Sequence, residues 1–167
     1  MPYIHPDLLI AQEHVYTSHG LALSNFVQEK ESQEYGACTF DMNNYKIVFR
    51  VAKITPTKTG QFVTLWKRIG NGPIMPFDMN DSFDNVIISI RQNQRLGQFI
   101  FSKSVLCEKG FVSQHGRGGK RAMRVYPPWD AADNKQAQKT QAWQCQYFFE
   151  IDMTKSADKD ILKRLLK

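Results

Sequence analysis

The segment 114–121, QHGRGGKR, has the composition of a phosphate-binding loop. Its three glycines let a backbone approach a phosphate closely, and Arg117, Lys120 and Arg121 supply positive charge. The GxxxxGKS or GxxxxGKT spacing of the P-loop is absent, which argues against nucleotide hydrolysis by that route. The segment therefore predicts an anion-binding loop. The alternative is a surface loop whose glycines only form turns.

Positive charge is concentrated in two stretches of a chain whose net charge is +6. Six basic residues and no acid lie between Lys46 and Arg68, and six basic residues accompany Glu108 between Lys103 and Arg124. Segment 7–41 has six acids and one lysine. Sorted charge creates a field that attracts phosphates, although an ordinary solvated surface is the alternative. We predict one basic face for nucleic acid, formed by Lys53, Lys58, Lys67, Arg68, Arg117, Lys120 and Arg121.

Aromatic residues offer a second kind of contact, because any base can stack on an aromatic ring. The candidates are Phe62, Trp66, Tyr126, Trp129, Trp143 and Tyr147, most of which we expect in the core. Trp129 is the best exposed candidate, since the two prolines before it in YPPWD discourage regular structure. We therefore add Trp129 to the predicted nucleic-acid-binding residues.

Metal and nucleophilic chemistry lack a motif of their own. The histidines at positions 5, 14, 19 and 115 show no ligand spacing with a carboxylate cluster, and we expect them to be solvated. The three cysteines are far apart and without CxxC spacing, which favours reduced structural thiols. No Gly-x-Ser-x-Gly element is present. No cofactor is predicted from these residues.

Hydrophobic periodicity and turn residues predict the elements that position these side chains. We expect a first helix over 7–18, capped by Asp7. An Asn43-Asn44 turn should join strands 35–41 and 45–53, the second half-buried because its apolar residues alternate. The remaining expected elements are strands 61–68, 85–92, 97–103, 122–126 and 146–151, a short helix from Ser102 or Ser104 to Cys107, a helix over about 130–145 and a charged helix in the tail.

Length and composition fit one domain over residues 1–167, of the α/β or α+β class, with a mixed, mostly antiparallel sheet flanked by helices. The 42% hydrophobic content is enough for one core. No apolar run reaches the length of about 18 residues that a membrane helix needs, and the first residues do not resemble a secretory leader. We therefore expect a cytoplasmic protein without a membrane partner.

Long stretches of the chain resemble the MepB-like family. They include ESQEYGACTF, FRVAKITPTKTGQFVTLWKR, NGPIMPFD, GQFIFSKSVL, GKRAMRVYPPWD and KTQAWQ, and together they span residues 31–151. The resemblance implies a small bacterial cytoplasmic protein whose namesake is encoded beside a multidrug efflux pump and its repressor. It also implies a restriction-endonuclease-like core related to the PD-(D/E)xK nucleases.

Such nucleases hold Mg²⁺ with carboxylates, and a lysine assists the attacking water. The matching positions here are Asp41 and Lys53, with Glu34 or Glu31 as the helix glutamate. The sequence departs from the pattern at one point, because Val51 stands two residues before Lys53 where the second metal-binding acid belongs.

We therefore predict a nucleic-acid-binding protein with little sequence specificity, using a basic face and a glycine-rich loop. The first alternative is a nuclease that uses Glu34, Asp41 and Lys53 with Mg²⁺ or Mn²⁺. The second is a non-catalytic partner that docks another protein through its acidic segment or its basic face. The sequence leaves the oligomeric state open.

Overall fold

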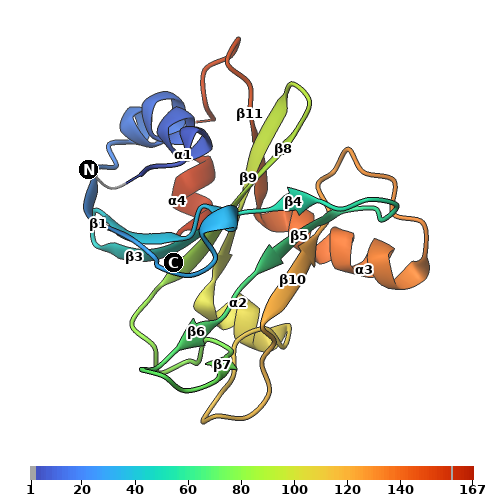
Figure 1. The fold of residues 1–167 in the computed structure, drawn as a ribbon. Helices are drawn as coiled ribbons and strands as arrows, with labels where there is room; N and C mark the ends of the chain where they lie inside the picture. The colour runs from blue at the N-terminus through green and yellow to red at the C-terminus, as the bar shows by residue number, and fades with distance from the viewer. Residues whose placement is uncertain (1–2, 159) are drawn as a thin grey trace.

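The computed structural model describes residues 3–158 and 160–167 (Figure 1). A main sheet has six strands in the order β1-β2-β3-β8-β9-β11, and a smaller sheet has the order β10-β5-β4. A third, two-stranded sheet pairs β6 with β7. The main strands are β1 (Leu23–Gln28), β2 (Cys38–Met42), β3 (Tyr45–Val51), β8 (Asn85–Gln92), β9 (Arg95–Ser102) and β11 (Phe148–Ile151). The short strands are β4 (Lys53–Ile54), β5 (Gln61–Thr64), β6 (Lys67–Arg68), β7 (Ile74–Met75) and β10 (Ala122–Val125).

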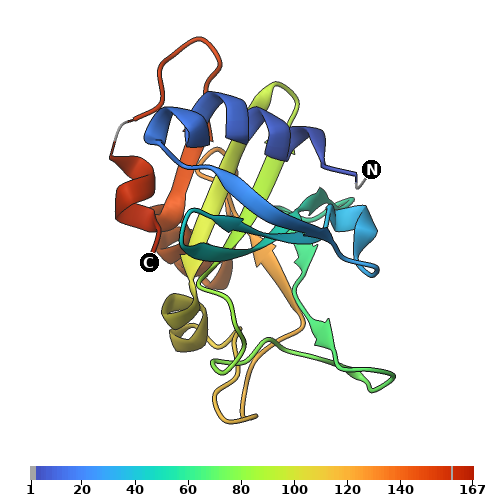
Figure 2. The same ribbon diagram turned by 90° about the vertical axis from the view of Figure 1, so that its left-hand side faces the viewer.

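Helices flank both sheets. The N-terminal helical segment comprises α1 (Pro6–Ala11), a π-helical turn (Gln12–Tyr16) and a 3-10 turn (Thr17–His19), and it lies across the main sheet in Figure 2. The other helices are α2 (Lys103–Glu108), α3 (Lys135–Gln144) and α4 (Ile161–Leu165), with 3-10 turns at Gln33–Tyr35 and Cys145–Tyr147. The predicted fold class is confirmed. No helix in the described ranges is both long and apolar enough to cross a lipid bilayer.

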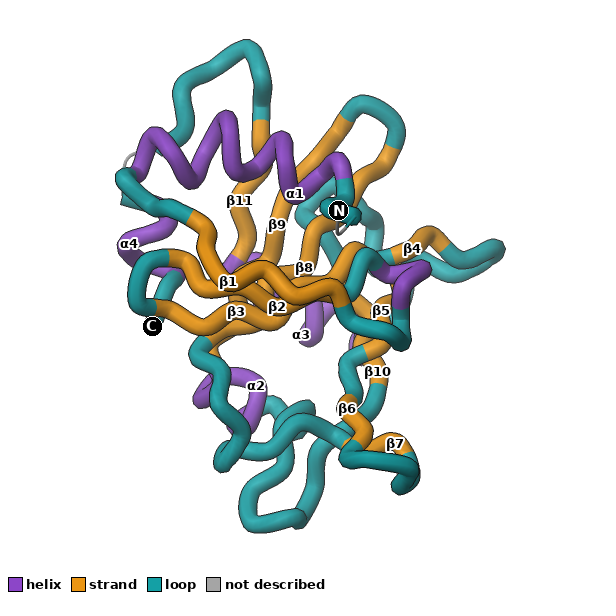
Figure 3. Tube along the Cα trace, turned by 60° about the vertical axis from the view of Figure 1, so that its left-hand side comes forward, coloured by secondary structure: helices purple, strands orange, loops and turns teal. Residues whose placement is uncertain are grey.

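One pair of neighbouring strands in the main sheet, β3 and β8, is parallel, and its other pairs are antiparallel. Parallel neighbours require a crossover connection, because the chain must return to the end where the first strand began. Residues 52–84 form that crossover here, and they contain β4, β5, β6 and β7. Figure 3 shows β4 and β5 to the right of the main sheet and β6 and β7 below it.

The hairpin between β2 and β3 arises where the sequence predicts its turn. Asn43 adopts a left-handed conformation, with φ +51°, in the turn between β2 and β3. Asn93 does the same, with φ +57°, between β8 and β9. Asparagine tolerates this conformation better than most residues, which explains the two turns. Ser102 caps α2 by accepting a hydrogen bond from the backbone nitrogen of Val105 at 3.2 Å, as predicted.

Two hydrophobic cores cover the two faces of the main sheet. One packs Ile47 and Phe49 against α1 and α4, and the other packs Val48 against the small sheet and α2. β3 is therefore buried on both faces from Ile47 onward, and the prediction of a half-buried strand is wrong. The alternation of the sequence is misleading because the second face buries a charged residue, Arg50, as well as Val48 and Ala52.

Two other predictions are corrected. His5, not Asp7, caps the first helix, since its Nδ1 accepts a hydrogen bond from the backbone nitrogen of Asp7 at 3.0 Å. Asp7 lies inside the helix, where its buried carboxylate accepts hydrogen bonds from Arg91 at 2.7 and 3.1 Å. The predicted strand 61–68 is divided, because the chain leaves the small sheet after Thr64 and β6 joins a separate hairpin.

Candidate functional site

The small sheet turns one face to the core and leaves its outer face partly open. In β5, Val63 is buried, whereas its neighbour Phe62 is half-buried. Lys53 of β4 and Arg124 of β10 are both register partners of Phe62. Residues directly opposite each other in antiparallel strands point to the same face, so these three side chains form one row across the sheet.

Aromatic rings and cations alternate along this row. The ring of Tyr35, from the 3-10 turn before β2, lies 6.2 Å from the ring of Phe62 between centroids. Lys53 Nζ is 5.0 Å from the centroid of Tyr35, and the guanidinium carbon of Arg124 is 5.9 Å from that of Phe62. Within the described ranges neither cation pairs with a carboxylate. We call Tyr35, Lys53, Phe62 and Arg124 the aromatic–basic row.

A buried guanidinium lies beside the end of the small sheet. The Arg50 side chain is 1% exposed, and burial lowers its pKa while Glu29 acts in the opposite direction. Its Nε donates to the carbonyl oxygen of Thr64 at 3.2 Å. Its Nη1 donates to the carbonyl oxygen of Phe49 at 2.9 Å and to the carboxylate of Glu29. Nη2 donates no hydrogen bond to a described residue.

Arg50 also lines a pocket of about 420 Å³ between β1, β3 and the start of the β6–β7 hairpin. We call it the Arg50 pocket. Its charged and aromatic lining residues are Glu29, Lys30, Glu31, Arg50, Trp66, Lys67 and Arg68. Three of its four cations are paired with acids, Arg50 with Glu29, Arg68 with Glu31 and Lys67 with Asp81, so the exposed Lys30 gives the pocket its net positive charge.

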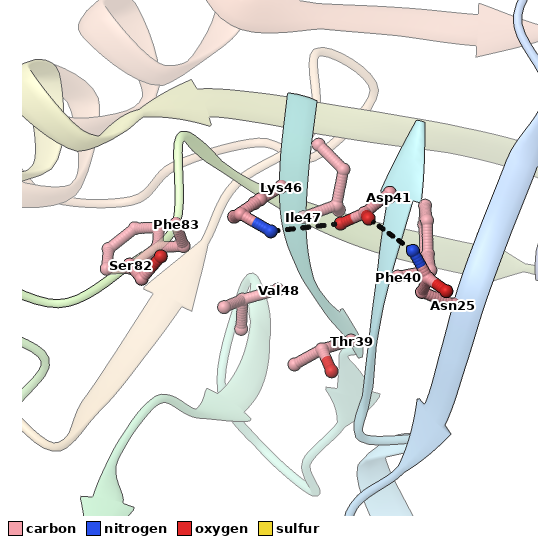
Figure 4. Close-up of a pocket in the computed structure, with 9 residues that line it drawn as sticks. All are labelled: Asn25, Thr39, Phe40, Asp41, Lys46, Ile47, Val48, Ser82 and Phe83. Carbon is pink, nitrogen blue, oxygen red and sulfur yellow. Dashed lines mark hydrogen bonds and ion pairs between the residues drawn. The ribbon is translucent and has the colours of Figure 1, made fainter. Parts of the chain in front are cut away.

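A second pocket, of about 380 Å³, opens beside Asp41 on the same face of the main sheet (Figure 4). Asn25 Nδ2 donates to Asp41 Oδ2 at 2.7 Å, and Lys46 Nζ lies 3.7 Å from Asp41 Oδ1. Asn25 has φ +53° at a bulge in β1, which turns its side chain toward Asp41. Both carboxylate oxygens of Asp41 therefore already have a partner.

The residues of the nuclease hypothesis are not brought together. Asp41 is the register partner of Lys46 at the start of β3, whereas Lys53 lies beyond the other end of that strand. Glu34 is exposed and adjoins Tyr35, which contacts Lys53. In residues 3–158 and 160–167, no three His, Cys, Asp or Glu side chains are grouped to hold a metal ion. Cleavage with Mg²⁺ or Mn²⁺ stays a prediction without an assembled site.

Three predicted basic residues lie in or next to the strands of the small sheet. Lys58 lies in the turn between β4 and β5, and Lys53 lies in β4. At the opposite end, the carbonyl oxygen of Arg121 accepts a hydrogen bond from the backbone nitrogen of Leu65 at 2.9 Å. The side chains of Lys53, Lys58 and Arg121 are exposed, but Arg121 is opposite Leu65 and so does not share the face of Lys53 and Arg124.

Two other predicted basic residues, in β6, are neutralised by acids. Lys67 Nζ donates to Asp81 Oδ1 at 2.6 Å. Arg68 Nε donates to Glu31 Oε1 at 3.0 Å, and its guanidinium carbon lies 5.6 Å from the ring of Trp66. Glu31 comes from the acidic N-terminal segment, so part of the sorted charge is paired within the molecule.

The glycine-rich loop already binds an anionic group of the protein. Asp78 Oδ1 accepts hydrogen bonds from Ser113 Oγ at 2.7 Å and from the backbone nitrogen of Gly116 at 3.2 Å. The bond from Ser113, with those from the backbone nitrogens of Asn80 and Gly116, lowers the pKa of Asp78 to about 2. A phosphate would meet this carboxylate at the loop. Arg117 and Lys120 stay exposed, and Lys120 Nζ lies 5.1 Å from the ring of Phe111.

Trp129 is engaged by its neighbours. Its ring meets that of Phe148 edge-on at 5.6 Å, and the guanidinium carbon of Arg95 lies 4.4 Å from its centroid. Its Nε1 donates to Gln92 Oε1 at 2.8 Å. Arg95 thus occupies the position over the ring that a base would need.

Three of the four histidines are half-buried, which corrects the expectation that all are solvated. His5 caps α1, and Nε2 of both His14 and His19 lies 2.6–3.0 Å from backbone carbonyl oxygens of segment 152–158. These residues attach the C-terminal segment to the N-terminal helix. His115 is exposed, as predicted.

The cysteines are free thiols, as predicted, but Cys107 and Cys145 are half-buried, whereas all three were expected to be buried. Cys38 is buried, and burial raises its pKa to about 12.

Sequence reasoning missed Tyr35 and Arg124 as site residues, and it placed Arg50 only in a basic stretch. Alternation gave a usable signal for Arg124, which stands between the apolar residues Met123 and Val125. No local signal distinguishes Arg50, because its burial depends on the small sheet and on Glu29, 21 residues earlier.

Fold and surface together define a small α+β protein whose second sheet presents aromatic and basic side chains beside a six-stranded main sheet. A family model described as MepB-like matches residues 29–150. This match covers more than half of the sequence, and the chain belongs to the MepB-like family. A solved structure described as "Crystal Structure of MepB" is 34% identical, with a TM-score of 0.75, over 89% of this chain and 97% of that chain. No curated protein matches this sequence.

Proposed function

We propose that this protein binds single-stranded nucleic acid, with little sequence preference, on the aromatic–basic row. The observation that carries the proposal is the register of the small sheet, which sets Lys53, Phe62 and Arg124 side by side with Tyr35 against them. Half-exposed rings can stack on the bases of a flexible single strand, and cations without a carboxylate partner can attract its phosphates. The row supplies both kinds of contact.

The two kinds of side chain have separate tasks in this proposal. Phe62 and Tyr35 offer ring faces to unstacked bases, and such stacking is worth about 1–3 kcal/mol per base. Lys53 and Arg124 attract the phosphates between those bases, and Lys58 in the adjacent β4–β5 turn adds positive charge. No base edge is read, so the proposal predicts little sequence specificity.

Fluorescence anisotropy with a labelled oligothymidylate tests this proposal. We expect binding that weakens between 50 and 200 mM salt, because cations released from phosphates drive association. Lys53→Gln should reduce the slope of log K against log salt by about 0.7, the value for one phosphate contact on a single strand. Phe62→Leu should weaken binding about tenfold at either salt concentration, since stacking is not ionic.

Lys163→Gln is the matched control. It also removes one positive charge, but Lys163 is an exposed residue of α4, whose buried residues pack in the core on the other face of the main sheet. Equal losses for Lys53→Gln and Lys163→Gln would mean that only net charge matters. Absence of binding at 50 mM salt, or tighter binding of a duplex than of its separate strands, would refute the proposal.

The finer predictions from the sequence remain open to experiment. An endonuclease-like core would be supported by cleavage with Mg²⁺ or Mn²⁺ that Asp41→Ala abolishes. Co-purification of a protein that nuclease treatment does not release would instead favour a protein partner. The expected cytoplasmic location can be checked by cell fractionation.

A further inference from the structure

Arg50 has hydrogen-bonding capacity that the protein does not use. A guanidinium carries five N–H donors and remains charged in proteins. Nε and Nη1 are bonded to Thr64, Phe49 and Glu29, whereas Nη2 has no partner in the described part of the chain. Nη2 is not among the buried polar atoms of the described residues that lack a partner, so this end of the otherwise buried side chain is accessible to solvent, where a ligand can replace water.

The free Nη2 has space for a ligand beside it. Arg50 lines a pocket of about 420 Å³, which lies within the range of about 300–1,000 Å³ found for small-molecule sites. Lys30 is exposed at the same pocket and has no carboxylate partner in the described ranges, whereas Arg68 at this pocket is paired with Glu31. An arginine with neighbouring cations is the usual arrangement for binding phosphate or carboxylate oxygens.

The pocket continues the line of the aromatic–basic row. Phe62, Thr64 and Trp66 are half-buried while the residues between them are buried, so the three share the outer side of β5 and its extension. Four residues of extended chain separate Phe62 from Trp66, or about 13 Å. A nucleic-acid strand bound across the row can therefore place its next nucleotides at Trp66 and at the Arg50 pocket.

We propose that the Arg50 pocket binds one phosphate monoester and, on the basis of the nucleic-acid binding proposed above, that this is the terminal phosphate of the bound strand. A monoester offers three free oxygens and nearly two negative charges at neutral pH. It can therefore meet Nη2 of Arg50 at one side of the pocket and Lys30 at the exposed side together. An internal phosphodiester has two free oxygens and one charge. The nucleic-acid chain on both sides of it would also have to leave the pocket.

Glu29 provides a test whose sign distinguishes a binding pocket from a structural ion pair. Its carboxylate bonds Nη1 of Arg50 and therefore repels a phosphate at Nη2. Glu29→Gln keeps the side-chain shape and removes this charge, so phosphate binding should become about tenfold tighter at an effective dielectric constant typical of a partly solvated site. A purely structural pair would give a less stable protein with no gain in phosphate affinity.

The experiment compares one oligothymidylate with a phosphate at its 5′ end, at its 3′ end, or at neither. Wild type should bind one phosphorylated form about tenfold more tightly than the unphosphorylated form. Lys30→Gln should reduce that preference, Glu29→Gln should increase it, and Lys163→Gln should leave it unchanged. Equal affinity of wild type for all three oligonucleotides, or a smaller preference in Glu29→Gln, would overturn the proposal.

A second measurement separates this proposal from the one on which it rests. Inorganic phosphate and thymidine monophosphate should shift the NMR signal of the Arg50 Nε–H group, which a row variant such as Phe62→Leu leaves intact. If this shift occurs and the unphosphorylated oligonucleotide does not bind, phosphate binding in the pocket is supported and nucleic-acid binding on the row is refuted. If that oligonucleotide binds and no shift occurs, binding on the row is supported and phosphate binding in the pocket is refuted. Equal affinity for thymidine monophosphate and the phosphorylated strand would keep the pocket and remove the strand-end assignment.

Discussion

Cys38 should make the protein lose stability in alkaline solution. Its thiol is 3% exposed, and burial raises its pKa from 9.0 to about 12, although the charge of Arg50 opposes the shift. The folded state thus keeps a proton that the unfolded state gives up. The contribution of the thiol is intact below pH 9 and is lost as the pH rises from there toward 12. At 1.5 pH units above the unfolded pKa, the loss is about 2 kcal/mol.

Urea unfolding at pH 8 and pH 10.5, with a reducing agent present, measures this loss. Cys38→Ala lacks the thiol, so wild type should lose about 2 kcal/mol more than the variant between the two pH values. The cavity left by alanine lowers the free energy of unfolding by the same amount at both pH values, so it cancels in this difference. Burial also raises the pKa of Tyr16, but Tyr16 is present in both proteins and cancels as well. Parallel losses in the two proteins would refute the reasoning.

Two further predictions concern stability and the glycine-rich loop. Gly97→Ala would place a Cβ atom 2.3 Å from Cζ of Phe148, so we expect a loss of about 1–3 kcal/mol in urea unfolding; an unchanged midpoint would mean that the ring moves freely. Asp78→Ala should speed tryptic cleavage at Arg117 by freeing Gly116, and equal cleavage rates would contradict this. Since the pKa of Asp78 is lowered from 3.8 to about 2, hydrogen exchange should show full loop protection above pH 4 and its loss as the pH falls through 2.

Local elements could be predicted because neighbouring residues determine them. The asparagine turn at Asn43 and the Ser102 cap of α2 depend on conformations and hydrogen bonds within a few residues. The resemblance to the MepB-like family likewise rested on continuous phrases, and the family match confirms it. Predictions of this kind need no knowledge of the tertiary structure.

The candidate site could be predicted only in part, because its charges are paired by contacts between distant segments. Lys67 meets Asp81 across 14 residues, and Arg68 meets Glu31 across 37. From composition alone, both cations were expected to be available for a polyanion. In the folded protein, these acids neutralise them. Lys53 belongs to the same basic stretch but has no carboxylate partner in the described chain. Its position beside Phe62 follows from the register of the small sheet, which the sequence did not predict.

Strand burial shows the same limit. The apolar alternation in β3 predicted one solvated face, but the small sheet covers that face as well. The cover comes from residues 61–65 and 122–125, which follow β3 along the chain and return to it. A periodic pattern reports which side chains are apolar, and it does not report what packs on the other side.

The crossover between β3 and β8 separates the framework of the protein from its exposed working parts. Both ends of segment 52–84 are fixed in the middle of the main sheet, while most of the row and one wall of the Arg50 pocket lie on the segment itself or against it. Val63 and Leu65 of this segment are buried in the core on one face of the main sheet, so a change in its length would disturb that packing as well as the row. The phrase FRVAKITPTKTGQFVTLWKR, which carries part of the resemblance to the MepB-like family, lies largely in this excursion, so relatives that keep the phrase also keep Lys53 and Phe62 of the row.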